Sequence, residues 1–127
     1  MTQKKIFLIC LFVILSFAHL QAQVVTISPQ FATQSDNITI TFDATKGNAA
    51  LLGQSTVYAH AGVITSLSST PTSWKYVQGN WGTDDSKVKM TSIGNNKFQL
   101  SYNITNFYGV PSSEKVLKLA FVFRNVS

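Results

Sequence analysis

The stretch that decides the fold is NITITFD, residues 37–43. Its apolar residues, Ile38, Ile40 and Phe42, alternate strictly with asparagine, threonine and aspartate. Because successive side chains of a strand point to opposite faces, this alternation is typical of a sheet with one buried and one solvated face. The stretch therefore predicts a half-buried β-strand.

Other segments of the chain show the same short, turn-bounded pattern. Residues 88–93 and 97–104 flank the turn-prone Gly94-Asn95-Asn96, which predicts a β-hairpin. Residues 116–123 are apolar on most of both faces, so we expect a strand at the centre of its sheet. Residues 106–113, with a glycine and a proline, are expected to form a loop. The remaining expected strands are residues 24–28, 56–62 and 73–77.

No amphipathic helix of ten or more residues is expected after residue 22. Six or seven short strands separated by turn residues are typical of a sandwich of two sheets. The sequence therefore predicts an all-β fold, an antiparallel immunoglobulin-like β-sandwich of about seven strands.

The N-terminus has the pattern of a secretory signal peptide. Met1–Lys5 carries two lysines, and an apolar run follows from Ile6 to Phe17, shorter than the roughly 20 residues that a spanning helix needs. We expect cleavage after Ala22, which leaves residues 23–127 as one domain and sends the protein to the cell exterior or surface.

Composition narrows the chemistry of residues 23–127. The single cysteine, Cys10, lies in the expected signal peptide, which excludes disulfides and thiolate chemistry from the domain. Loss of Lys4 and Lys5 lowers the formal net charge from +5 to +3, and the remaining lysines are scattered. A nucleic-acid partner is therefore not expected.

No catalytic arrangement is visible in the sequence. Asp84 and Asp85 are adjacent in a predicted turn, and we interpret them as solvated turn residues rather than a glycosidase pair or a calcium site. There is no Gly-x-Ser-x-Gly motif for a nucleophilic serine and no spacing of zinc ligands. We expect neither a metal nor a cofactor, and no enzymatic activity of the chain itself.

Aromatic side chains in polar surroundings favour a binding surface instead. In the strand around Val57–Gly62, Tyr58 and His60 share the face opposite the core, so both are expected to stand in solvent. Alternation also places Trp74 and Tyr76 on one face. Rigid rings with a polar rim suit the C–H faces and hydroxyls of sugars. The candidate carbohydrate-binding residues are Tyr58, His60, Trp74, Tyr76 and Trp81; alternatively, either tryptophan is the buried core tryptophan of a sandwich.

Several motifs carry a family resemblance: Tyr58–Val63, Trp74–Val77, Trp81-Gly82, Lys89–Phe98, Phe107–Pro111 and Leu119–Arg124. With these motifs the chain resembles, over nearly all of its length after the signal, a module near the N-terminus of secreted Bacteroidetes proteins, including α-amylase-family glycoside hydrolases similar to glycoside hydrolase family 13. Over a short motif it is similar to the starch-binding carbohydrate-binding modules of families 25 and 26.

The resemblance implies a non-catalytic module that binds starch or another α-glucan, linked in a longer parent to a catalytic domain. It places Tyr58, His60 and Trp74 in the binding platform, with Trp81 as a second tryptophan. The chain departs from the starch-binding pattern in the long Ser/Thr loop between His60 and Trp74. The alternative function is a structural immunoglobulin-like spacer in a secreted or cell-surface multidomain protein.

Overall fold

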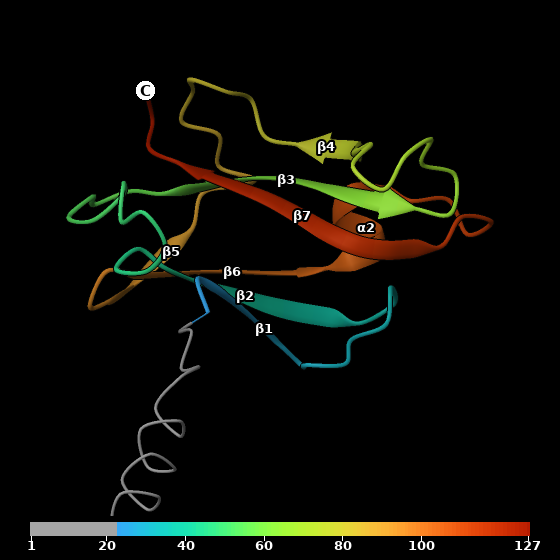
Figure 1. The fold of residues 1–127 in the computed structure, drawn as a ribbon, viewed down its shortest axis with the longest axis horizontal. Coiled ribbons are helices and arrows are strands. Elements are labelled where there is room, and N and C mark those ends of the chain that lie inside the picture. The colour runs from blue at the N-terminus through green and yellow to red at the C-terminus, as the bar shows by residue number, and fades with distance from the viewer. Residues whose placement is uncertain (1–22) are drawn as a thin grey trace, which may run out of the picture.

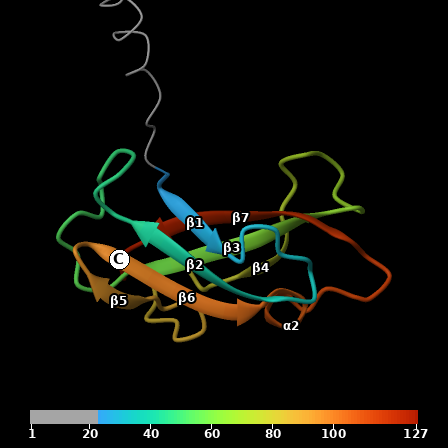
Figure 2. The ribbon, with the colours of Figure 1, turned by 90° about the horizontal axis from the view of Figure 1, so that it is seen from below.

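The computed structural model describes residues 23–127, so the expected signal peptide lies outside the described residues. Two antiparallel sheets face each other (Figure 1, Figure 2), which confirms the all-β sandwich. The four-stranded sheet has the order β1 (Val25–Ser28), β2 (Asn37–Asp43), β6 (Lys97–Asn103), β5 (Thr91–Gly94). The three-stranded sheet has the order β4 (Lys75–Gln78), β3 (Tyr58–Thr65), β7 (Val116–Arg124).

The strand order is that of an immunoglobulin-like sandwich. β1, β2, β6 and β5 take the places of strands A, B, E and D, while β3 and β7 take those of C and F. β4 lies on the free side of β3, where variable-type domains carry strand C′. Among the described residues, no strand occupies the place of G beside β7.

The core lies between the two sheets. The alternation of residues 37–43 is confirmed, because Ile38, Ile40 and Phe42 are all buried. β2 pairs residue for residue with β6, and Phe42 lies opposite the buried Phe98. Burying one side chain of this size stabilises a fold by roughly 1.5–3 kcal/mol. In the other sheet, the inward residues of β3, and Val57 just before it, are small and fully buried; these are Val57, Ala59, Ala61 and Val63.

The prediction that the last strand lies centrally in its sheet is wrong. β7 is an edge strand, and β3, buried on both faces except at His60, is the central one. β7 contributes Phe123, which stacks on Phe42 with the ring centroids 4.2 Å apart. The prediction failed because the apolar composition of a strand indicates how much apolar side-chain surface it buries, but not which strands pair with it.

The hairpin of β5 and β6 is confirmed, whereas the loop expected from residue 106 begins as a helix. α2 (Ile104–Tyr108) starts at Asn103, whose side chain accepts a hydrogen bond from the backbone N–H of Asn106 at 3.1 Å. It ends at Gly109 in the left-handed conformation with φ 69°. A five-residue helix has too few turns to leave an amphipathic pattern in the sequence.

α2 packs at one end of the sandwich, where Tyr102 stacks on Phe107 with centroids 4.0 Å apart. The hydroxyls of the partly buried Tyr102 and the buried Tyr108 are 2.7 Å apart, so these polar groups satisfy each other. Burial raises the pKa of Tyr102 to about 12. Both hydroxyls therefore stay neutral in ordinary buffers.

Within residues 23–127, no helix has the length and apolar character needed to cross a membrane.

Candidate functional site

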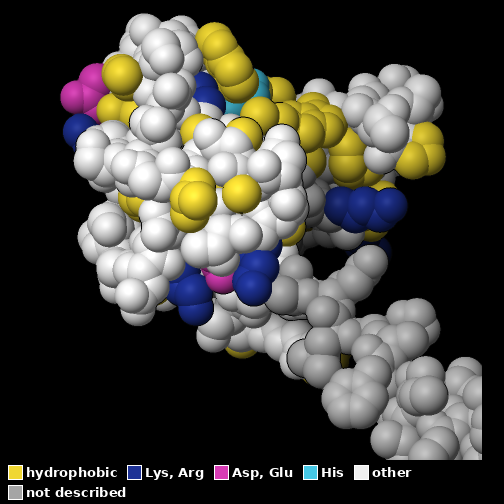
Figure 3. Space-filling model, turned by 60° about the vertical axis from the view of Figure 1, so that its left-hand side comes forward, with side chains coloured by type: hydrophobic (Ala, Val, Ile, Leu, Met, Phe, Trp, Pro, Cys, Tyr) yellow, Lys and Arg dark blue, Asp and Glu magenta, His cyan; other side chains and the backbone are white. Residues whose placement is uncertain are grey.

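The outer face of the three-stranded sheet carries a group of aromatic side chains. Because Ala59, Ala61 and Val63 point into the core, alternation turns His60 and Gly62 outward. Hydrophobic side chains gather beside the histidine on this side of the molecule (Figure 3). We define the aromatic face as His60, Trp74, Val77, Trp81 and Val122.

His60 connects the two tryptophans. Its ring lies 6.4 Å from the Trp74 ring at an interplanar angle of 29°, and 5.4 Å from the Trp81 ring at 82°. The Trp74 ring is therefore moderately inclined to the imidazole, and the Trp81 ring is nearly perpendicular to it. The rings of His60 and Trp81 thus form a corner rather than a flat strip.

Gly62 provides the floor on which Trp74 lies. A Cβ atom at this glycine would be 3.0 Å from Cε3 of Trp74 and 3.3 Å from Cγ2 of Val77. These separations are tighter than nine in ten real Cβ contacts, so the glycine lets the indole rest on the backbone of β3 without a shift of a few tenths of an ångström.

A bulge in β4 explains why Tyr76 is not part of this face. The register between β3 and β4 shifts between Ala61 and Val63, and Tyr76 has a positive φ of 52°. The extra residue turns Tyr76 toward the core while Trp74 and Val77 both stay outside. The prediction that Trp74 and Tyr76 share a face is therefore wrong, because simple alternation does not hold across a bulge.

The Tyr76 hydroxyl instead joins a buried polar cluster around Glu114. The carboxylate of Glu114, itself only 2% exposed, accepts hydrogen bonds from Tyr76 at 2.5 Å, from Lys75 at 2.5 Å and from Thr65. These donors, Lys75 first, lower the pKa of Glu114 to about 2. The cluster fastens the segment before β7 to β3 and β4, which is a structural role.

Tyr58 shares the outward side of β3 with His60 but does not stand in solvent, so that expectation is wrong. The side chain is 1% exposed, and its hydroxyl donates a 2.6 Å hydrogen bond to Asp84. This bond, followed by the ion pair with Lys89, lowers the pKa of the Asp84 carboxyl. Asp84 is thus more than a solvated turn residue, because it holds its loop over Tyr58.

Arg124 holds the loop that carries Trp81. Its guanidinium donates hydrogen bonds to the backbone oxygens of Asn80 at 2.7 Å and Thr83 at 2.9 Å. Its Cζ also lies 5.6 Å from the centroid of the Trp81 ring. Because the buried guanidinium of Arg124 bonds to two carbonyls of this loop, it holds Trp81 in position over the sheet.

Gly79 lets the same loop pass close to His60. Its φ of 110° lies in the region that favours glycine, and a Cβ there would be 3.3 Å from Nδ1 of His60. Nδ1 is buried with no hydrogen-bond partner. Hydrogen bonding of His60 to a ligand is therefore left to Nε2.

The face offers stacking surface and few polar groups. Trp81 is 58% exposed, Val77 45% and Val122 43%, so apolar side chains of two strands and one loop are exposed to water on this face. Within residues 23–127, no three side chains of the types that ligate metals come together. The arrangement suits the binding of a ligand with apolar faces.

The structure brings three of the five sequence-predicted residues together, His60, Trp74 and Trp81, and leaves out Tyr58 and Tyr76. It adds Gly62 and Arg124, which position the rings without offering much surface themselves. The glycine interrupting an apolar strand was a usable signal, since such a glycine often marks a close approach. Nothing in the local sequence links Arg124 to a loop some forty residues earlier.

The fold and this face define an immunoglobulin-like β-sandwich domain with an exposed aromatic group on its three-stranded sheet. The chain belongs to a domain family of unknown function, DUF8578, whose family model matches residues 25–127. No curated protein matches the chain.

Proposed function

We propose that this domain is a non-catalytic carbohydrate-binding module that binds starch or another α-glucan on the aromatic face. The observation that carries the proposal is the convergence of His60, Trp74 and Trp81 on the outer side of one sheet. Indole and imidazole rings offer flat surface to the C–H faces of a sugar, and Nε2 of His60 offers a hydrogen bond at the rim.

The shape of the corner supports a curved ligand. A glucose unit lying against Trp74 and His60 would meet Trp81 as a wall at 82° to the imidazole. A curved glucan chain can contact both surfaces, whereas a flat and extended chain would leave one of them. The choice of α-glucan also rests on the resemblance to starch-binding modules.

The proposal includes an exported protein and an activity located elsewhere. We propose secretion or display at the cell surface through the N-terminal signal, and a covalently linked catalytic domain in longer relatives. The isolated domain should release no reducing sugar from starch. The alternative role as a spacer would be favoured by two buried tryptophans, and Trp81 is 58% exposed.

Affinity electrophoresis in gels with and without soluble starch tests the proposal. We expect starch to retard the protein, and Trp74→Ala or Trp81→Ala to weaken binding by at least about tenfold. Phe31→Ala is the matched control, because Phe31 is an aromatic residue, 89% exposed, outside the aromatic face. Absence of retardation, or equal retardation of all variants, would refute the proposal.

A further inference from the structure

The outer edge of β7 is open. β7 pairs with β3, and no second strand pairs with it within residues 23–127, so one edge presents unpaired N–H and C=O groups. Natural edge strands are usually short or protected by proline and charge. β7 has nine residues, no proline and, before its last residue, one lysine, and its Leu117 and Val122 are 61% and 43% exposed.

A side chain already closes the beginning of this edge. Gln34 accepts a 3.0 Å hydrogen bond from the backbone N–H of Val116 and donates one of 3.3 Å to the backbone oxygen of Glu114. The Gln34 amide thus makes the two hydrogen bonds that one residue of a neighbouring strand would make. The edge that remains free begins at Leu117 and ends with β7 at Arg124.

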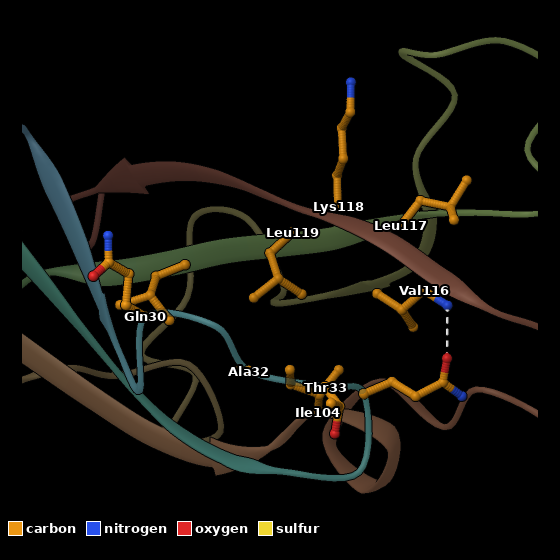
Figure 4. Close-up of a pocket in the computed structure, with 10 residues that line it drawn as sticks. Gln30, Ala32, Thr33, Ile104, Val116, Leu117, Lys118 and Leu119 are labelled. Carbon is orange, nitrogen blue, oxygen red and sulfur yellow. Dashed lines mark hydrogen bonds between the residues drawn. The ribbon is translucent and has the colours of Figure 1, made fainter.

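A groove of ≈ 190 Å³ lies beneath this edge, where the sandwich is open between β1 and β7. Val116 and Leu119 point into it toward Ile104, while Lys118 points the other way (Figure 4). The inward residues of β7, including Phe121 and Phe123, are only partly buried. The apolar interior is therefore less well covered beside β7 than around β3.

We propose that a second copy of this chain covers the edge, with the two β7 strands antiparallel and related by a two-fold axis at Ala120. This axis lies near the middle of the free edge and places Lys118 opposite Val122 of the other copy. An axis one residue further along, at Phe121, would oppose Lys118 and Arg124, two cations. With the axis at Ala120, β7 therefore pairs with itself over its free edge without opposing like charges.

This pairing joins the two three-stranded sheets into one continuous sheet. A two-fold axis perpendicular to the sheet keeps both outer surfaces on the same side, so the aromatic faces of the two copies point in one direction. The dimer does not depend on the proposed function. If both hold, a polysaccharide would meet two sites at once, which raises its apparent affinity.

Sedimentation velocity of the purified protein from low to high micromolar concentration tests the proposal. We expect a concentration-dependent dimer. Val122→Glu would face Lys118 of the other copy and tighten the dimer, whereas Val122→Lys would weaken it, each by about tenfold because every pair occurs twice. Val122 is exposed in the monomer, so neither change should impair folding, which circular dichroism checks.

Ile93→Lys is the control, since Ile93 is 47% exposed on β5, in the other sheet. It should leave the dimer unchanged. A protein that stays monomeric over the whole concentration range overturns the proposal. In that case the edge of β7 would be available to a different polypeptide. A dimer that responds equally to the two Val122 variants overturns the proposed register. Because the readout is mass, either result is separate from starch binding.

Discussion

The guanidinium of Arg124 stacks on the ring of Tyr58, with Cζ 4.5 Å from the ring centroid. The two residues lie directly opposite each other in the register of β3 and β7. On its other side the guanidinium binds the backbone of the Trp81 loop. One cation therefore links both strands to the loop that completes the aromatic face.

Replacing the guanidinium should loosen this loop. Arg124→Met keeps much of the apolar stem but leaves the oxygens of Asn80 and Thr83 without their donor. We expect the melting temperature to fall by about 10 °C, because two hydrogen bonds from a charged donor are lost. Starch binding should weaken as Trp81 loses its fixed position. Thermal melts, together with hydrogen exchange of residues 80–83, measure both effects.

Lys118→Met is the matched control, because it removes an exposed cation from the same strand. It should leave the melting temperature and the exchange of the loop unchanged. Equal exchange in the Arg124 variant and the wild type would show that the loop is held by other contacts.

The Glu114 cluster predicts a loss of stability in acid. The pKa of Glu114 is about 2 in the folded protein and 4.5 without these contacts. Since the folded value is the lower one, the contribution is complete above pH 4.5 and disappears as the pH falls toward 2. The melting temperature should therefore decrease over this interval.

Asp36, Asp43 and Asp84 also have lowered pKa values, so the wild-type curve alone does not isolate Glu114. Glu114→Gln should melt at a lower temperature at neutral pH, because it removes the buried carboxylate that pairs with the partly exposed Lys75. The difference between the variant and the wild type should shrink as the pH falls toward 2. A difference that is constant with pH would contradict the assignment.

Local patterns in the sequence were sufficient for the sandwich and for the hairpin. The alternation of residues 37–43 predicts both the strand and its buried face, because one residue in two must be apolar on a half-buried strand. The candidate site was predicted in part. His60 and Trp74 are on the outer face as expected, and Tyr58 has the expected direction without the expected exposure.

The remaining features depend on contacts between distant residues. Tyr58 is covered by Asp84 and Arg124, which lie 26 and 66 positions later in the chain. The bulge at Tyr76 and the edge position of β7 are likewise set by neighbouring strands. The alternation of apolar and polar residues predicts the face of a strand to which a side chain points. Its exposure depends on the distant segments that pack over that face.

The backbone conformation of the turn between β5 and β6 predicts how substitutions of Asn95 change stability. Asn95 and Asn96 have φ of 53° and 58°, the left-handed conformation that two-residue hairpin turns require. Asn95→Ala should lower the free energy of unfolding by about 1 kcal/mol, because a Cβ without a local hydrogen-bonding group disfavours this conformation. Asn95→Gly should be nearly neutral. Urea unfolding of both variants measures the difference, and equal losses would contradict this explanation.

Gly62→Ala tests whether the position of Trp74, rather than its presence, creates the binding surface. The added methyl group would meet Cε3 of Trp74 at 3.0 Å, so the indole must shift by a few tenths of an ångström from its place on β3. We expect starch affinity to fall by about threefold, less than for removal of the ring itself, with a shift in tryptophan fluorescence emission. Gly53→Ala is the control, because a Cβ at Gly53 meets nothing within 4 Å and φ there is 77°. That change should cost about 1 kcal/mol of stability and leave starch binding intact. Wild-type retardation of Gly62→Ala in a starch gel would mean that Trp74 does not bind sugar from its place on Gly62.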